Sequence, residues 1–329
     1  MKLIRFDAPG PPDVLQCLDV PVPEPKAGEV LIRAHAIGVG MPDVMIRAGT
    51  YAWMPPLPAT PGTELAGTIE MVGAGVTARQ IGQRVYITAR ERPQRGGHYA
   101  EYVATPVEAT FPLPASVGFE AAAALANYQV AYHIFHDGVR LRGGETVLIY
   151  AAAGGMGNAL IDFAKAGGLV VIGVVGSDDK ARFARELGAD HVVNRKSEKL
   201  AERVSAITGG RGVDAIIDPV GGATIPGNLA LLAPCGTLVV YGMLGGRAQL
   251  DLQPTLRQSR NSPALRQFSI HTWDELIEER RAGMRAVIDM LAAGKLAPRI
   301  HGVLPLAQAR RAHEMLAGGE VLGKLLLAP

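Results

Sequence analysis

The chain has 329 residues, of which 48% are hydrophobic and 19% charged, so it is long enough and apolar enough for two globular domains. Its 33 Lys and Arg residues nearly balance its 31 Asp and Glu residues, which leaves a formal net charge of +2. Because no excess or long run of one sign occurs, the charge pattern favours neither a nucleic-acid partner nor a membrane surface.

The apolar segments and the cysteines narrow the class further. No apolar run approaches the ~18 residues of a membrane span, and the first residues lack the uninterrupted apolar segment of a secretory signal. We therefore expect a cytoplasmic protein. Only Cys17 and Cys235 are present, which excludes a disulfide framework and a cysteine-rich metal cluster. Their apolar neighbours predict that both thiols are buried.

The first 120 or so residues are predicted to be rich in β-structure. Short β-branched and apolar runs at 29–36, 65–72 and 83–88 are separated by proline and glycine. Short strands at such spacing are typical of a compact, barrel-like domain.

From about residue 118 the pattern changes to alternating helices and strands. Helices are predicted first, at 119–126 and 128–135. The alternation then runs through strand 146–150, helix 156–166, strand 169–175, helix 178–187, strand 190–193, helix 197–207, strand 213–218, helix 223–233 and strand 236–241. This order predicts a parallel, doubly wound α/β sheet.

The last part of the chain is expected to return to the first domain. Residues 250–262 are polar and loop-like, 273–293 is a long helical pattern, and 321–327 is an apolar strand. We therefore predict a β-rich domain at 1–122 that is completed by 262–329, and an α/β domain at 123–261.

The segment Val147-Leu-Ile-Tyr-Ala-Ala-Ala-Gly-Gly-Met-Gly157 is the strongest functional signal. An apolar strand breaks into small residues and continues as a helix, so backbone N–H groups and the positive helix end face an anion such as a dinucleotide pyrophosphate. Gly154 would permit the tight turn, and Gly157 would let the helix lie close to the strand. The alternative interpretation is a plain βαβ turn.

The end of the next strand indicates which dinucleotide is bound. Enzymes that use NAD commonly place an acid there to bind the ribose 2′-hydroxyl, but this strand ends in Gly176 and Ser177. Lys180 follows in the same turn and Arg195 follows the third strand. A small residue with two cations suits a 2′-phosphate, so we expect NADPH rather than NADH.

These motifs resemble the medium-chain dehydrogenase/reductase superfamily, in its zinc-free, zeta-crystallin-like quinone oxidoreductase branch. The resemblance runs nearly end to end. It is carried by Ile37-Gly-Val39 through Asp43, Ile46-Arg-Ala-Gly49, Pro61-Gly-Thr-Glu64, Gly82-Gln-Arg-Val85, Gly97-His-Tyr-Ala-Glu-Tyr102, the glycine turn, Leu187-Gly-Ala-Asp190 and Gly323-Lys324. It implies a GroES-like, β-rich catalytic domain and a Rossmann nucleotide-binding domain.

The residues at the family's zinc positions differ from those of zinc-containing alcohol dehydrogenases. The position of the first thiol ligand falls near Gly40, and the Gly-His-Glu motif is Gly62-Thr63-Glu64, without the imidazole. A stable zinc site needs three or four N, O or S ligands. We therefore expect no metal and an acceptor that is already electrophilic, such as a quinone or an α,β-unsaturated carbonyl.

The resemblance also implies the residues of the site. Tyr51 resembles a tyrosine placed near the nicotinamide, where it would donate a hydrogen bond to the acceptor oxygen; packing on a loop is the alternative. The cofactor contacts expected from the turn, the strand end and the resemblance together are Asn127, Val130, Ala153, Gly154, Gly155, Met156, Gly157, Gly176, Ser177, Lys180, Arg195, Tyr241, Gly242, Phe268 and Lys324. Core packing is the alternative for Phe268, and a surface charge is the alternative for Lys324.

Two other functions stay open at this point. One is an enoyl-thioester (enoyl-CoA or carrier-protein) reductase, for which Arg257, Arg260 and Arg266 would have to form a phosphate-binding patch. The other is a non-catalytic, crystallin-like protein that holds NADPH. Relatives with two domains commonly pair through the edge of the nucleotide-binding sheet, so the resemblance also implies a homodimer.

Overall fold

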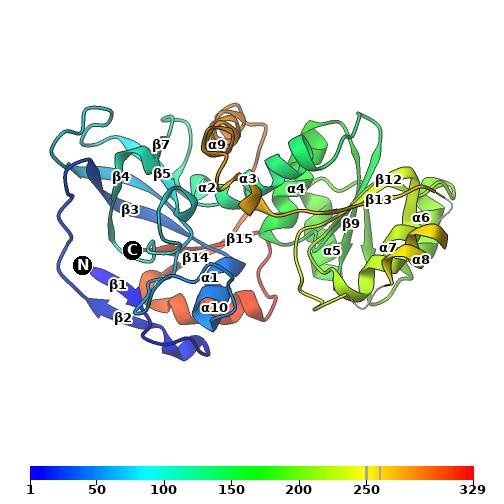
Figure 1. Cartoon of the computed structure of the whole chain (residues 1–329), viewed down its shortest axis with the longest axis horizontal. Coiled ribbons are helices and arrows are strands. Elements are labelled where there is room, and N and C mark those ends of the chain that lie inside the picture. The colour runs from blue at the N-terminus through cyan, green and yellow to red at the C-terminus, as the bar shows by residue number, and fades with distance from the viewer. Residues whose placement is uncertain (249–250, 259–260) are drawn as a thin grey trace. The chain divides into compact units, whose positions relative to one another are not determined.

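The described residues of the computed structural model, 1–248, 251–258 and 261–329, form two compact units (Figure 1). Unit 1 comprises residues 1–126 and 284–329, and unit 2 comprises residues 127–283. Residues 262–283, which we expected in the first domain, lie in unit 2, because their strand β13 (Ala264–Gln267) joins the sheet of that unit.

Unit 1 is built on a seven-stranded sheet in the order β14-β15-β3-β4-β5-β7, with β6 paired to β3. Its strands are β3 (Glu29–Val39), β4 (Glu64–Val72), β5 (Arg84–Thr88), β6 (Tyr102–Pro106), β7 (Thr110–Pro112), β14 (Ile300–Pro305) and β15 (Lys324–Ala328). Strand β3 pairs antiparallel with β4, β6 and β15. Its register with β4 shifts at two points, and such irregularities bend a strand so that it can pair with all three neighbours. A separate hairpin is formed by β1 (Lys2–Arg5) and β2 (Gln16–Asp19).

The helices of unit 1 follow or flank this sheet. They are α1 (Met41–Ala48), α2 (Phe119–Ala122) and α10 (Ala309–Ala317), with the 3₁₀ turns η1 (Pro12–Val14), η2 (Ala89–Glu91), η3 (Val107–Ala109) and η7 (Leu306–Gln308). Helix α1 is flanked by its cap residues Gly40 and Gly49, and the φ of 74° at Gly49 lies in the left-handed region that glycine adopts without strain. Helices α3 (Leu125–His133) and α9 (Ile277–Ala292) each contain a point where the chain passes from one unit to the other.

Unit 2 is a parallel sheet of six strands in the order β10-β9-β8-β11-β12-β13. The strands that precede β13 are β8 (Thr146–Tyr150), β9 (Val170–Val175), β10 (His191–Asn194), β11 (Val213–Asp218) and β12 (Leu232–Val240). The helical elements are η4 (Ile134–Gly138), α4 (Gly155–Ala166), α5 (Asp178–Glu186), α6 (Leu200–Thr208), η5 (Gly222–Thr224), α7 (Ile225–Leu231), α8 (Leu252–Gln258) and η6 (Ile270–Trp273). The chain adds strands outward from β8 on one side and from β11 on the other, which confirms the doubly wound prediction.

Two predictions about local structure are wrong. The segment 250–262 contains helix α8, whose Leu256 packs against the apolar core of unit 2. Both cysteines are exposed rather than buried. Cys17 lies in β2, whose side chains are mostly exposed, and Cys235 has a φ of 62°, a backbone conformation that interrupts the inward alternation of β12.

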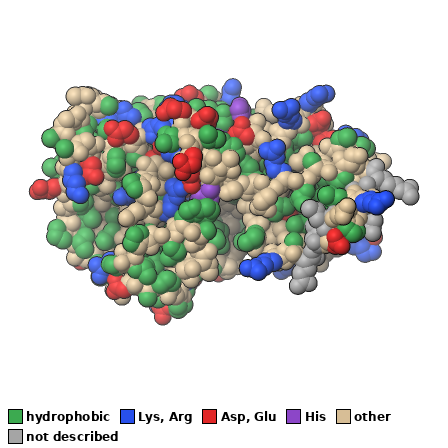
Figure 2. Space-filling model, viewed as in Figure 1, with side chains coloured by type: hydrophobic (Ala, Val, Ile, Leu, Met, Phe, Trp, Pro, Cys, Tyr) green, Lys and Arg blue, Asp and Glu red, His purple; other side chains and the backbone are tan. Residues whose placement is uncertain are grey.

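The molecular surface carries both signs of charge. On the face drawn in Figure 2, Lys and Arg side chains are interspersed with Asp and Glu. None of the helices in the described part of the chain has the length and apolar character needed to cross a membrane.

Candidate active site and cofactor site

The glycine turn of unit 2 brings helix α4 close to strand β8. An added Cβ at Gly157 would lie 2.4 Å from the Ala152 carbonyl oxygen and 2.5 Å from that of Ala151, so only glycine fits there. Gly154 is the N-cap residue of α4, and no side chain among the described residues caps this helix. The first N–H groups of α4 are therefore available to an anion, which fits a dinucleotide pyrophosphate.

The end of strand β9 has a small residue beneath two cations. Gly176 follows β9, and an added Cβ there would lie 3.9 Å from the Arg195 Nε and Nη2 atoms and 3.9 Å from Lys196 Cε. Arg195 was expected from the sequence, whereas Lys196 was missed. The only sequence signal for Lys196 is its place directly after Arg195, beyond strand β10.

Asp178, the acid that follows the end of β9, is hydrogen-bonded to another side chain of unit 2. Asp178 Oδ1 accepts a hydrogen bond from Asn194 Nδ2 at 2.8 Å. Ser177 caps helix α5, since its Oγ accepts from the Lys180 backbone N–H at 3.4 Å. Asp178 is thus tied to the end of β10, and the surface over Gly176 is cationic, as a 2′-phosphate requires.

The other cofactor residues expected in the sheet region follow the carboxyl ends of its strands. Tyr241 and Gly242 follow β12, and the Tyr241 N–H donates to the Asp218 carbonyl at the end of β11, at 3.0 Å. An added Cβ at Gly242 would lie 2.5 Å from the Pro219 carbonyl oxygen, so the two loops pack backbone to backbone. Phe268 follows β13. In open α/β sheets, ligands bind at this edge, where the strand order reverses.

Asp218, which the sequence did not single out, holds the loop after β11 in place. Its carboxyl is fully buried and accepts from the Val220 N–H at 2.7 Å, from Thr224 Oγ1 at 2.6 Å and from Asn228 Nδ2 at 2.9 Å. Burial and this nearby acid raise the pKa of Tyr241. The side chain of Tyr241 therefore stays neutral at physiological pH.

The remaining predicted positions of unit 2 lie on α3 and directly after β13. Asn127 and Val130 lie on α3 and are half-buried. Phe268 is buried, and its ring centroid lies 5.4 Å from that of Trp273, as the packing alternative requires, while its backbone N–H donates to Val240 at 2.8 Å.

Of the three arginines considered for binding a thioester substrate, the structure describes Arg257 and Arg266. Arg257 is exposed on α8, and Arg260 lies outside the described residues. Arg266 Nη1 donates to the Asp137 carbonyl oxygen at 3.0 Å, so this guanidinium is partly used within unit 2. The structure therefore gives no specific support to a phosphate-binding patch at these arginines.

In unit 1, Tyr51 follows the C-terminal end of α1. Its side chain is half-buried and packs against the small apolar cluster of Phe6, Ile46 and Ala59. Its ring centroid lies 5.8 Å from that of Trp53, which is 45% exposed. The loop after α1 thus presents two aromatic side chains, one of which carries a hydroxyl group.

Lys324 is buried, so the alternative that it is a surface charge is excluded. Its side chain is 5% exposed and its Nζ lies 2.6 Å from Oε1 of Glu64, which is fully buried. The other carboxylate oxygen of Glu64 accepts from the Ala126 N–H at 2.7 Å and from the Tyr86 hydroxyl at 3.1 Å. This charge pair joins β15 to the start of β4.

A second buried carboxyl, Asp43, lies between the two positions that carry zinc ligands in zinc-containing relatives. Its oxygens accept from the Gly40 N–H at 2.8 Å, the Gly62 N–H at 3.1 Å and Thr63 Oγ1 at 3.4 Å. Among the residues that the structure describes, no group of three or more His, Cys, Asp or Glu side chains is arranged to hold a metal ion. Gly40 itself offers no side-chain ligand.

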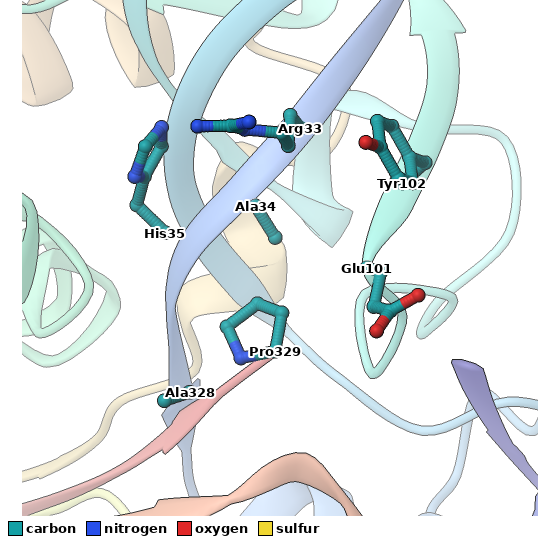
Figure 3. Close-up of a pocket in the computed structure, with 7 residues that line it drawn as sticks. All are labelled: Arg33, Ala34, His35, Glu101, Tyr102, Ala328 and Pro329. Carbon is teal, nitrogen blue, oxygen red and sulfur yellow. The ribbon is translucent and has the colours of Figure 1, made fainter. Parts of the chain in front are cut away.

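Figure 3 shows a pocket of about 370 Å³ elsewhere in unit 1, between β3, β6 and the end of β15. Its polar lining is Arg33, His35, Glu101 and Tyr102. No residue expected in the active site lies in it. We therefore do not assign it to the reaction.

Comparison with known proteins covers both units. Residues 26–115 match the alcohol dehydrogenase GroES-like domain, and residues 155–294 match the zinc-binding dehydrogenase family. The chain is 33% identical to the quinone oxidoreductase of Rattus norvegicus, over 99% of this chain and 97% of that protein. It is 34% identical to the quinone oxidoreductase of Pseudomonas aeruginosa, over 100% of this chain and 99% of that protein.

A solved structure gives the same result. Escherichia coli quinone oxidoreductase complexed with NADPH is similar over 100% of both chains, with 32% identity and a TM-score of 0.89. Full-length similarity of this kind, together with the glycine turn and the residues at the zinc positions, establishes the family. The chain belongs to the quinone oxidoreductase branch of the medium-chain dehydrogenase/reductase superfamily.

Proposed function

We propose that this protein is an NADPH-dependent reductase that transfers hydride to quinones or α,β-unsaturated carbonyls without zinc. The observation that carries the proposal is the pair Arg195 and Lys196 over Gly176, at the end of β9 in a chain related over its full length to quinone oxidoreductases. The similarity to the NADPH complex of the Escherichia coli enzyme supports the same cofactor.

The predicted residues of unit 2 can be matched to the pyrophosphate, the ribose 2′-phosphate and the nicotinamide of NADPH. The uncapped N-terminus of α4 and the turn at 153–157 would hold the pyrophosphate. Gly176, Ser177, Lys180, Arg195 and the additional Lys196 would hold the ribose 2′-phosphate. Asn127, Val130, Tyr241, Gly242 and Phe268 would contact the nicotinamide end. Lys324 lies in unit 1, where its ammonium group is paired with Glu64.

The chemistry needs a hydride, a proton and stabilisation of charge on the acceptor oxygen. NADPH supplies the hydride when it is bound. As the electron-poor acceptor is reduced, negative charge develops on its oxygen, and the Tyr51 hydroxyl would donate a hydrogen bond to it. Tyr51 or water then supplies the proton that completes the hydroquinone or the saturated carbonyl. The Trp53 ring beside Tyr51 offers an apolar surface to a flat acceptor.

Zinc is not expected to take part, because Gly40 and Thr63 supply neither thiolate nor imidazole where zinc-containing relatives have them. The acceptor must therefore be polarised by hydrogen bonds alone. This requirement favours substrates whose carbonyl groups are already conjugated and electron-poor.

A substrate panel tests the proposal. Purified protein is assayed for NADPH oxidation with benzoquinone, naphthoquinone, a 2-alkenal and crotonyl-coenzyme A, each with NADH as the matched control. We expect turnover with quinones or the alkenal and a clear preference for NADPH. Turnover with crotonyl-coenzyme A alone would favour an enoyl-thioester reductase, and NADPH binding without any turnover would favour the non-catalytic, crystallin-like role.

We also propose a homodimer that forms through strand β13, which lies at the edge of the sheet and has mostly exposed side chains. Because the Phe268 N–H donates inward to Val240, strand alternation directs the Gln267 N–H outward. Light scattering after size exclusion should give a dimer mass for the wild type and for Gln267→Ala, and a monomer mass for Gln267→Pro. A monomeric wild type would contradict this.

A cytoplasmic location fits the two cysteines, which are both free and exposed. Exposed thiols persist where the redox environment is reducing. Cell fractionation with an antibody to the protein tests the location, and recovery outside the cytoplasmic fraction would contradict it.

A further inference from the structure

The carboxyl of Asp43 connects three parts of unit 1. It accepts from the N–H of Gly40 at the end of β3, and from the N–H of Gly62 and the hydroxyl of Thr63 ahead of β4. The Tyr99 hydroxyl lies 3.5 Å from its Oδ2 and 3.2 Å from Nε2 of His313 on α10. Desolvation lowers the pKa of His313 to about 3, so its ring is neutral.

The segments that Asp43 joins lie side by side. A Cβ built on Gly40 would be 3.8 Å from Thr63 Oγ1 and 3.7 Å from Asp43 Oδ2. Hydrogen bonds to one carboxyl join these two segments.

This arrangement has a cost in stability. Asp43 is fully buried. The charge of Lys324 favours the ionised form of Asp43, but the Lys324 ammonium lies 2.6 Å from Glu64 and forms its ion pair there. Desolvation is the main cause that raises the pKa of Asp43 to about 7. An apolar residue would avoid the cost of burying a carboxyl, so the cost points to a role beyond packing.

We infer that Asp43 is a positioning residue for the reductase reaction: by joining Gly40 to Gly62 and Thr63, it fixes helix α1 and, through it, Tyr51. The inference rests on the proposed function. Helix α1 has two turns only, with Asp43 in the first and Gly49 directly after the last. The Thr50 N–H donates to Met45 at 2.9 Å, so the loop that carries Tyr51 is attached directly to the helix.

The first test does not depend on activity. The chain has two tryptophans, so Trp273→Phe leaves Trp53, whose ring neighbours Tyr51, as the only tryptophan, and excitation at the red edge of tryptophan absorption reports on it alone. In that background, Asp43→Asn and Thr63→Val should each change the acrylamide quenching constant of Trp53, by about 1.5-fold or more, because a shift of α1 moves the loop. Thr68→Val removes a threonine hydroxyl on β4 that is hydrogen-bonded to His35 of β3; it is the matched control and should leave the quenching constant unchanged.

The second test separates positioning from folding. The same substitutions in otherwise wild-type protein should lower kcat by about tenfold for Asp43→Asn and less for Thr63→Val, since small displacements of a catalytic group are costly. The NADPH dissociation constant and binding stoichiometry should stay within twofold, because the proposed 2′-phosphate and pyrophosphate contacts lie in unit 2. A merely structural role would lower the stoichiometry and kcat in proportion.

The outcomes are distinct. Unchanged Trp53 quenching in Thr63→Val and Asp43→Asn would overturn the inference, as would a wild-type kcat per NADPH-binding molecule. If Asp43→Asn does not fold, Thr63→Val decides alone. If the wild type reduces no acceptor, the proposed function fails, and the Trp53 measurement still decides whether Asp43 positions the loop.

Discussion

At the scale of single residues, Lys324 and Glu64 form an ion pair in unit 1 whose side chains are only 5% and 0% exposed. A buried pair contributes little compared with an apolar replacement, but breaking it leaves a charge without a partner. Lys324→Met should therefore lower the free energy of unfolding by about 3–5 kcal/mol. The double variant with Glu64→Gln should regain a large part of this loss. Urea unfolding of the four proteins measures the coupling, and simple additivity would contradict the pair's role.

Tyr51 is the residue on which the proposed chemistry depends. Tyr51→Phe removes the hydroxyl and keeps the ring that packs on Ile46. If the hydroxyl stabilises charge on the acceptor, kcat should fall by about 100-fold while NADPH affinity stays the same. Tyr102→Phe, which removes a hydroxyl from the pocket in Figure 3, is the control and should keep full turnover. Equal kinetics for the wild type and Tyr51→Phe would remove Tyr51 from the mechanism.

We propose that Arg195 and Lys196 select NADPH over NADH. Both side chains lie over Gly176, where a 2′-phosphate would lie. The double substitution to alanine should weaken NADPH binding by about 100-fold and leave NADH binding nearly unchanged, because charge-assisted hydrogen bonds to phosphate are lost only for NADPH. Isothermal titration with both nucleotides measures this, with Lys199→Ala as the surface control. A similar loss for both nucleotides would refute the assignment.

Several of these residues could not be assigned from the sequence. The pairing of Lys324 with Glu64 joins positions 260 residues apart, and no local pattern reports such a contact. Asp43 stood in a recognisable motif, but its complete burial depends on strands and helices from the whole of unit 1. By contrast, Gly157 could be predicted, because its neighbours in the turn are also its neighbours in sequence.

At the scale of elements, the approach of α4 to the turn after β8 is the feature most sensitive to a single atom. Gly157→Ala would place a methyl group against the backbone carbonyl groups of Ala151 and Ala152, which cannot move independently of the strand. We expect a loss of about 1–3 kcal/mol in stability and weaker NADPH binding.

A second glycine serves as the control for this substitution. Gly227 lies exposed in α7 and an added Cβ meets nothing within 4 Å. Gly227→Ala should therefore be neutral or stabilising, by up to about 1 kcal/mol. Thermal unfolding and NADPH titration of both variants compare the two helices. Equal behaviour would show that the α4 contact is not tight.

Some secondary-structure elements could be predicted from the hydrophobic pattern of the sequence, and others could not. Strands β8, β9 and β11 are mostly buried and rich in Val, Leu and Ile, and they were predicted at nearly their observed bounds. The edge strand β13 has mostly exposed side chains, so its sequence lacks that signal, and residues 262–283 were not expected in the unit that contains this strand. Helix α8 was missed because the surrounding residues are polar.

At the scale of the whole molecule, the residues proposed for function are divided between the two units. The proposed NADPH contacts lie mainly in unit 2, whereas Tyr51, Asp43 and the pair of Glu64 with Lys324 lie in unit 1. The chain passes between the units within α3 and again within α9. Full-length similarity to quinone oxidoreductases, over both units, supports a single catalytic function for the two.

The most direct test of the account is steady-state reduction of a quinone by protein that has been treated with a chelator and shown by atomic spectroscopy to lack zinc. The account predicts that this protein oxidises one NADPH for each hydroquinone formed, with undiminished kcat and a clear preference for NADPH over NADH. Loss of activity that returns only when zinc is added back, or equal use of both nucleotides, would contradict it.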